Sequence, residues 1–207
     1  MKDKTKALWD KQNQHPGDRW RLFRAVAKAV SAQKVLYAGS YVDVAASFAF
    51  PNVTYVDMDK RANAFFDDRE GVKEIIAAHE GAPASPKFSF VHGDYSKLDF
   101  TPQSFDLLIS LYAGFISDSC TKFLKIGGQL LVNPSHGDAA LASLNPQYQL
   151  GAVVQSRDAD YKVSTQNLET YLQPKKPISL TRDMVFGAGK GIGYTKSPFA
   201  YLFTRVK

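Results

Sequence analysis

The sequence has little cysteine and no long apolar run, and both absences exclude classes of protein. Its 207 residues include one cysteine, Cys120, which excludes an internal disulfide and a metal site built from several cysteines. No pair of histidines has metal-ligand spacing, so we expect no metal. No run approaches the roughly 18 to 20 apolar residues that a membrane-spanning helix needs, and the first residues, MKDKTKALWDKQNQ, are polar where a signal peptide is apolar. We expect a cytoplasmic protein with no membrane partner.

Positive charge is concentrated near the N-terminus. Residues 1–34 hold nine Lys and Arg against three Asp, which equals the whole formal net charge of +6, and the remainder is neutral. Such a segment can bind an anionic partner, or it can be the solvated face of a helix. We favour the second interpretation, so a nucleic-acid partner stays open but is not favoured. We expect a basic N-terminal arm at 1–18 and one domain at 19–207.

Short runs of β-branched and aromatic residues predict the strands of a sheet. Five of them alternate with helical patterns, which implies a parallel sheet with right-handed crossovers that binds ligands at the carboxyl ends of its strands. A final strand is clear and two more segments before it could be strands. The five runs are KVLYAGS, VTYVDMD, FSFVHGD, SFDLLISLYA and LKIGGQLLVN, and the later ones are YQLGAVVQ, YKVST and PFAYLFTRV.

Helical patterns stand before the first strand and between the strands. One covers residues 19–30. Another covers REGVKEIIAAHEG, and Asp68 directly before it is the expected N-cap. The turn after the first strand is expected to lead into a helix over VAASFAF, with Asp43 as its N-cap. The expected fold class is α/β, with a doubly wound, mostly parallel sheet of about seven strands whose last strand is antiparallel, and helices on both faces.

In their order these segments resemble class I S-adenosylmethionine-dependent methyltransferases, a Rossmann-like superfamily, over about residues 19–133. The matching stretches are VLYAGS, VTYVDMD, FSFVHGDYSKLDF, SFDLLISLYA and FLKIGGQLLV. The last is the most distinctive, because it is similar to the LKPGG turn common in that family. The resemblance implies S-adenosylmethionine as cofactor and transfer of its methyl group. It identifies neither the methyl acceptor nor a catalytic residue.

The resemblance assigns residues at two strand ends to the adenosine part of the cofactor. Asp57 falls where the acidic residue of the family binds the two ribose hydroxyls, which one carboxylate can do. Asp94 falls where family members contact the adenine amino group, and Met58 or Tyr95 would pack against the ring. Helix capping is the alternative for both acids, and Asp59 could share the role of Asp57.

The first turn is poor in glycine, and the family pattern fits it only in part. The resemblance implies that the turn of Gly39, Ser40 and Tyr41 holds the methionine end of the cofactor, with backbone approaching closely at Gly39. S-adenosylmethionine has no phosphate, so fewer glycines are needed than in a dinucleotide fold. Tyr37 stands where the family often has an acid and Tyr41 where it has a second glycine. We expect the Tyr41 ring to point away from the cofactor, and Asp43 could supply the missing charge.

Residues near the ends of later strands are weaker candidates. By the resemblance, Leu111 and Tyr112 face the reacting methyl group, with ordinary core packing as the alternative that we favour for Leu111. His136 is either a general base or a polar turn residue. Cys120 is expected to pack in the core.

Two other functions stay open. Because of Tyr37 and Tyr41, the chain could be a non-catalytic binding or scaffold protein that keeps the methyltransferase-like fold. A nicotinamide-dependent oxidoreductase is disfavoured, because the first turn lacks the glycines that a pyrophosphate needs.

Overall fold

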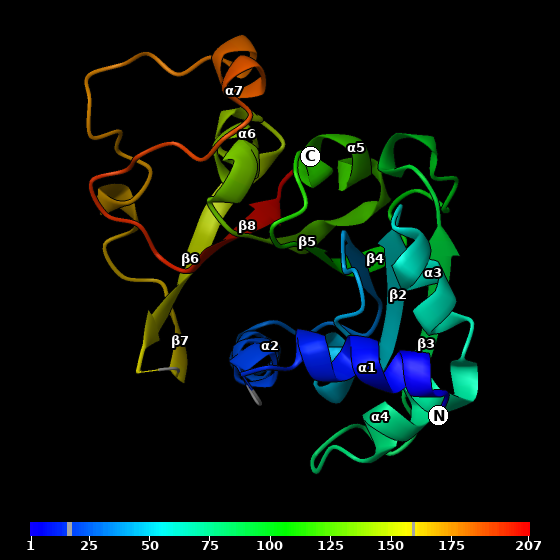
Figure 1. The fold of residues 1–207 in the computed structure, drawn as a ribbon. Helices are drawn as coiled ribbons and strands as arrows, with labels where there is room; N and C mark the ends of the chain where they lie inside the picture. The colour runs from blue at the N-terminus through cyan, green and yellow to red at the C-terminus, as the bar shows by residue number, and fades with distance from the viewer. Residues whose placement is uncertain (16–17, 159) are drawn as a thin grey trace.

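In the part of the chain that the structure describes, eight strands form one sheet in the order β3-β2-β1-β4-β5-β8-β6-β7 (Figure 1). The computed structural model describes residues 1–15, 18–158 and 160–207. The strands β3, β2, β1, β4 and β5 are parallel, and β8 is antiparallel to both of its neighbours. The expected doubly wound fold is confirmed, with eight strands in place of about seven. The strands are β1 Val35–Ala38, β2 Asn52–Asp57, β3 Lys87–His92, β4 Phe105–Ser110, β5 Leu124–Val132, β6 Tyr148–Arg157, β7 Asp160–Ser164 and β8 Ala200–Arg205.

Alternate residues of the central strands enter two cores on opposite faces of the sheet. Val35 and Tyr37 of β1 pack with α2, α3 and α4, whereas Leu36 and Ala38 pack with α5 and α6. This two-sided burial explains why the strand sequences are almost wholly apolar. Of the helices that the structure describes, none is long and apolar enough to cross a membrane. The helices are α1 Asp3–Gln12, α2 Asp18–Ala29, α3 Lys60–Phe66, α4 Arg69–Ala77, α5 Ile116–Cys120, α6 Asp138–Leu144 and α7 Arg182–Ala188, and the 3-10 turns are η1 Ala45–Phe48, η2 Tyr95–Lys97, η3 Thr121–Phe123, η4 Ser135–Gly137 and η5 Leu168–Thr170.

The connection from β1 to β2 contains only η1, so the helix expected over VAASFAF is wrong. Every residue from 42 to 48 is buried, which leaves no solvated face for an α-helix. The Tyr55 hydroxyl of β2 also binds backbone groups of this segment. It lies 3.1 Å from the Ser47 N–H, which donates to it, and 3.1 Å from the Val44 carbonyl, which accepts from it. The segment is a buried irregular crossover.

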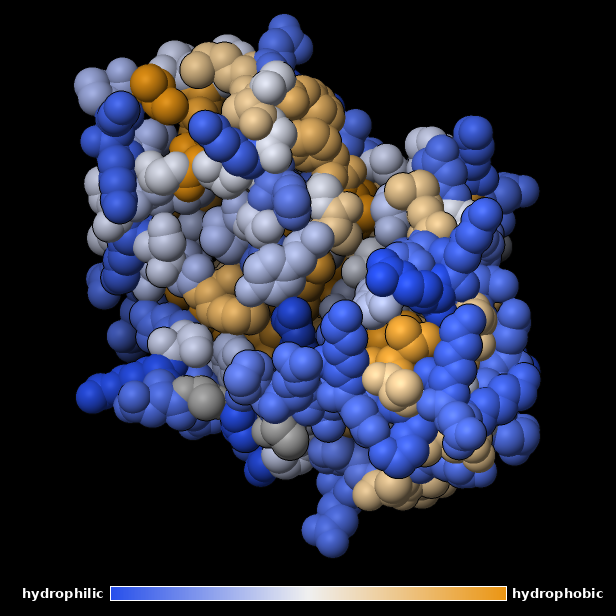
Figure 2. All heavy atoms as spheres, in the orientation of Figure 1, coloured by the Kyte–Doolittle hydropathy of each residue, from blue (hydrophilic) through white to orange (hydrophobic). Residues whose placement is uncertain are grey.

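The N-terminal helix α1 packs on α3 and α4 beside this short crossover (Figure 1). Asp68, the predicted cap of α4, accepts from the Gly71 N–H at 3.3 Å and also from the Lys2 N–H at 2.7 Å, which fixes the start of α1. The Trp9 ring meets the Phe48 ring edge-on, with centroids 6.0 Å apart. Figure 2 shows mostly hydrophilic side chains over α1 and α2, in keeping with the basic sequence of this segment.

Candidate functional site

The turn after β1 contains two residues in the left-handed region, Gly39 with φ +74° and Tyr41 with φ 51°. A Cβ on Gly39 would lie 1.9 Å from the Cβ of Ala113, in the loop after β4, so only glycine fits there. Ser40 between them is buried, and its hydroxyl lies 3.4 Å from the Tyr41 carbonyl. From the sequence we expect the cofactor to approach the backbone closely at Gly39. In the structure the group close to Gly39 is Ala113 of the same chain.

Asp57 joins the end of β2 to this turn. It is 8% exposed; its Oδ2 accepts from the Tyr41 N–H at 2.7 Å and its Oδ1 from the Asp59 N–H at 2.8 Å. A carboxylate has about four acceptor positions, so both oxygens keep capacity for a further donor. The Tyr41 ring lies 5.2 Å from the Arg61 guanidinium of α3. Asp57 therefore organises the turn and still offers two acceptors.

Asp94 and its neighbours lie at the end of β3. Its Oδ1 accepts from the Ser96 N–H at 2.9 Å and the Ser96 hydroxyl at 2.8 Å, so the capping role left open by the sequence is present. Both bonds lower the pKa of Asp94. The Tyr95 hydroxyl lies 3.6 Å from the Cβ position of Gly39, whereas Met58 is 54% exposed. Tyr95 thus reaches the first turn, and Asp94 mainly supports its own turn.

Leu111 and Tyr112, the two candidate residues after β4, differ in burial. Leu111 is buried in the core, as favoured. Tyr112 is 51% exposed and has φ 61°; its N–H donates to Asn133 Oδ1 at 3.3 Å. The Arg19 guanidinium lies 5.2 Å from the Tyr112 ring centroid. Tyr112 lines a cavity of about 270 Å³ together with Arg19, and a second of about 400 Å³ together with Asn133.

A buried polar network connects α2 to the first turn. Asp43 Oδ2 accepts from the Tyr37 hydroxyl at 3.1 Å and lies 3.6 Å from Arg19 Nε, while Asp43 Oδ1 accepts from the Ala45 N–H at 3.0 Å. Burial raises the pKa of Asp43, and the nearby Arg19 opposes this shift. Asp43 therefore supports the start of η1, and its charge is already paired. No pattern in the sequence distinguishes Arg19, because it is one of nine basic residues in the N-terminal segment.

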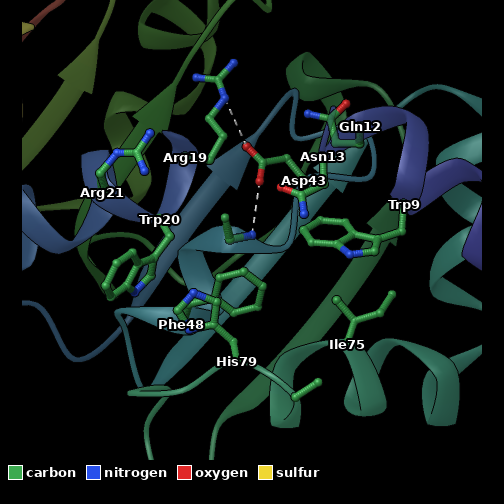
Figure 3. A pocket seen from close by; sticks show the side chains of 12 residues that line it. Trp9, Gln12, Asn13, Arg19, Trp20, Arg21, Asp43, Phe48, Ile75 and His79 are labelled. Carbon is green, nitrogen blue, oxygen red and sulfur yellow. Dashed lines mark hydrogen bonds and ion pairs between the residues drawn. The ribbon is translucent and has the colours of Figure 1, made fainter. Parts of the chain in front are cut away.

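An aromatic cavity of about 470 Å³ adjoins this network (Figure 3). Figure 3 shows Phe48 and His79 between Trp9 and Trp20, and Asp43 and Arg19 towards one end. The His79 ring stacks on Phe48, with centroids 4.1 Å apart and planes at 13°, and lies 4.8 Å from the Trp20 ring. Burial lowers the pKa of His79. No candidate residue from the sequence except Asp43 lines this cavity.

Asp138 of α6 is a further buried carboxylate, and it contacts the end of β4 and the start of α5. Asp138 accepts from the Ser110 hydroxyl at 2.6 Å and from the N–H and hydroxyl of Ser117 at 3.1 and 2.5 Å. Burial outweighs these bonds and raises the pKa of Asp138 to about 6. Cys120 is fully buried, as expected, and burial raises its pKa to about 12, so the thiol stays protonated. His136 is exposed on η4.

No family model and no curated protein sequence matches the chain. Among solved structures, it superposes on a candidate O-methyltransferase from Klebsiella pneumoniae with a TM-score of 0.52 and 9% identity, covering 79% of this chain and 88% of that one. For the N-methyltransferase NodS from Bradyrhizobium japonicum WM9 the TM-score is 0.49 at 17% identity, with 73% and 96% covered. For a candidate S-adenosylmethionine-dependent methyltransferase from Methanococcus maripaludis it is 0.49 at 14% identity, with 69% and 71% covered. The first superposition shows that this chain shares the fold of that candidate O-methyltransferase.

Proposed function

We propose that the protein is an S-adenosylmethionine-dependent methyltransferase of the cytoplasm, with the cofactor at the carboxyl edge of β1, β2 and β4. The observation that carries the proposal is Asp57. It is a nearly buried carboxylate at the end of β2, bonded to the backbone of the glycine-containing turn after β1, and it has acceptor capacity left for two hydroxyls. The fold supports the same edge, because parallel sheets of this kind bind ligands at the carboxyl ends of their strands.

The other predicted contacts follow from this position. Asp57 accepts from both ribose hydroxyls, and Asp94 accepts from the adenine amino group with Met58 or Tyr95 against the ring. Gly39, Ser40 and Tyr41 hold the methionine end. Leu111 supports the methyl-transfer region from within the core, and Tyr112 borders it from the exposed side.

Methyl transfer needs little chemistry from the protein. The sulfonium is already activated, so the protein must mainly align an acceptor nucleophile in line with the methyl group. The 400 Å³ cavity that Tyr112 shares with Asn133 lies at the ends of β4 and β5 and could admit that acceptor. A general base is needed only where the nucleophile carries a proton.

For the cofactor to approach Gly39 closely on the side of Ala113, the loop after β4 must move away from the first turn. The Ala113 methyl group fills the space beside Gly39, so backbone and cofactor cannot approach there while the loop is in this position. Tyr112 and Gly114, with φ of 61° and 86°, flank Ala113 and both lie in the left-handed region. We expect the loop to move about these two residues.

The same contact supports a second candidate function, a non-catalytic binding protein with a methyltransferase-like fold. If the loop after β4 keeps this position, the methionine end of the cofactor has no space beside Gly39 on the side of Ala113. Calorimetry with S-adenosylmethionine, S-adenosylhomocysteine and NAD distinguishes the two. Saturable binding of the first two without NAD supports the methyltransferase. Absence of binding by all three supports the binding protein, and binding of NAD alone would contradict both.

A further inference from the structure

The aromatic cavity exists because the β1–β2 crossover is short. Parallel strands are usually joined by a helix that fills the space over them, but here η1 is the whole of the regular structure between β1 and β2. The helices α1 and α2 cover the remaining space, and Ile75 of α4 and His79, two residues after that helix, complete the lining. A hollow of about 470 Å³ beside two tryptophans forfeits packing contacts that a larger side chain would restore.

The walls of the cavity suit a flat ring. The stacked pair of Phe48 and His79 lies between Trp9 and Trp20 (Figure 3), with the Trp9 ring centroid 6.0 Å from that of Phe48 and the Trp20 ring centroid 4.8 Å from that of His79. The four rings form one aromatic wall of the cavity. The volume lies within the range of about 300–1,000 Å³ found for small-molecule pockets, which are typically apolar with a few polar groups.

The polar end of the cavity suits an anion. Arg19 is held at Nε by Asp43, and its two terminal nitrogens make no hydrogen bond within the described part of the chain. Two such nitrogens match the two oxygens of a carboxylate. Asp43 would repel an anion, but its oxygens already accept from Tyr37 and Ala45 and its charge faces Arg19. Arg21 also lines the cavity, with its charge paired with Asp18.

We propose that this cavity binds a planar aromatic carboxylate, with the ring against the aromatic wall of Trp9, Phe48, His79 and Trp20 and the carboxylate on Arg19. The site is separate from the proposed cofactor edge, since Gly39, Asp57 and Asp94 do not line it. The proposal therefore does not depend on methyl transfer.

The two tryptophans are the only ones in the chain, and both line the cavity, so they report on its occupancy. Fluorotryptophan-labelled protein should give two fluorine NMR signals, assigned with Trp9→Phe and Trp20→Phe. We use cinnamate as the probe, with neutral cinnamamide and cationic cinnamylamine as matched controls. Cinnamate should shift both signals saturably and bind at least about tenfold more tightly than cinnamamide, as expected for charge-assisted hydrogen bonds. Cinnamylamine should bind most weakly. S-adenosylhomocysteine should not displace cinnamate.

Two variants test the location. Arg19→Gln should remove the preference for cinnamate over cinnamamide while leaving cinnamamide binding in place, and Arg157→Gln, whose side chain is 94% exposed on β6, should change neither. Ala78→Trp places a large ring at the exposed rim of the cavity without touching the charged network, and it should abolish the response to all three probes. If Arg19→Gln does not fold, the affinities of the unaltered protein for the three probes test whether the site prefers an anion. Ala78→Trp then tests whether the probes bind in this cavity.

Unshifted tryptophan signals at millimolar cinnamate would overturn the proposal. Equal affinity for cinnamate and cinnamamide, or a preference for cinnamylamine, would overturn the assignment of a carboxylate. Binding that survives Ala78→Trp would show that the probes occupy another place. If the unaltered protein binds cinnamate but not S-adenosylhomocysteine, the proposed methyltransferase is contradicted and the proposed aromatic carboxylate site is not.

Discussion

The Ala113 methyl group occupies the position beside Gly39 that any side chain on Gly39 would need. An added Cβ on Gly39 would lie 1.9 Å from that of Ala113 and 3.3 Å from the Ala113 Cα. The two residues lie on the loops after β4 and β1, which are neighbouring strands in the sheet. The first turn is therefore held from two sides, by Asp57 through the Tyr41 N–H and by Ala113 through direct packing.

Gly39→Ala should lower the free energy of unfolding by about 2–5 kcal/mol. A left-handed residue other than glycine costs about 1–2 kcal/mol, and the clash with Ala113 adds about 1–3 kcal/mol. Adding Ala113→Gly removes only the clash, so the double variant should be more stable than Gly39→Ala alone. Urea denaturation of the four proteins measures this coupling. Strictly additive effects would show that the two residues do not press on each other in solution.

Asp57→Ala should weaken the binding of S-adenosylhomocysteine by about 1.5–3 kcal/mol, the scale of hydrogen bonds to a charged group. It should also destabilise the fold by about 1–3 kcal/mol, because the Tyr41 N–H loses its acceptor. Asp57→Asn keeps one acceptor oxygen and is the matched variant. Calorimetry on the folded variants measures affinity apart from stability. An unchanged affinity in folded Asp57→Ala would remove Asp57 from the cofactor site.

Substitutions of Tyr41 test two properties of the turn separately, the strain of its left-handed backbone and the contact of the Tyr41 ring with the cofactor. With φ at 51°, Tyr41→Gly should be more stable than Tyr41→Ala by about 1–2 kcal/mol, since both lose the ring and only glycine relieves the left-handed backbone. The ring packs near Arg61, so we expect the affinity for S-adenosylhomocysteine to change less than about tenfold in Tyr41→Gly. A tenfold gain in affinity would mean that the ring blocks the methionine site and would favour the non-catalytic protein.

Asp138 should make stability fall as the pH rises. Its pKa in the folded protein is about 6, above the ordinary value of 3.8, so between these values the folded state keeps a proton that the unfolded state has released. The slope of the unfolding free energy with pH is then negative, by about 1.4 kcal/mol per pH unit in the middle of the window. Asp138→Asn removes this titration. The stability of the unaltered protein minus that of Asp138→Asn, measured by urea denaturation, should decrease from pH 4 to 6, and a constant difference would contradict the raised pKa.

The basic N-terminal segment should bind nucleic acid only weakly at physiological salt. Arg21 is paired with Asp18, and the Arg24 guanidinium lies 5.0 Å from the Trp20 ring centroid. Part of the positive charge of the segment therefore already interacts with groups of the same chain. Fluorescence anisotropy with labelled single-stranded RNA over a range of salt measures the affinity. A submicromolar, salt-dependent complex that is lost when Arg21 and Arg24 are changed to Glu would contradict this expectation and identify the class of acceptor.

The sheet and its helices could be predicted from the sequence because their signals are local. Strands covered on both faces need continuous apolar runs, and the run in β4 is of this kind. The cap of α4 could be predicted for the same reason, since Asp68 and Gly71 are three residues apart. The acids at the strand ends, Asp57 and Asp94, follow directly from where the strands stop.

The contacts that shape the candidate sites were decided by the tertiary structure. Arg19 meets Asp43, and Gly39 meets Ala113, only when elements distant in the chain pack together, and no spacing in the sequence marks these pairs. The missing crossover helix is a further case. The segment from 42 to 48 has the composition of a helix, but its burial on every side and the Tyr55 hydroxyl stabilise one 3-10 turn instead. Local pattern therefore determined which elements form, because it reflects burial along one segment. Packing between segments determined which side chains share a site, because that depends on where the other elements lie.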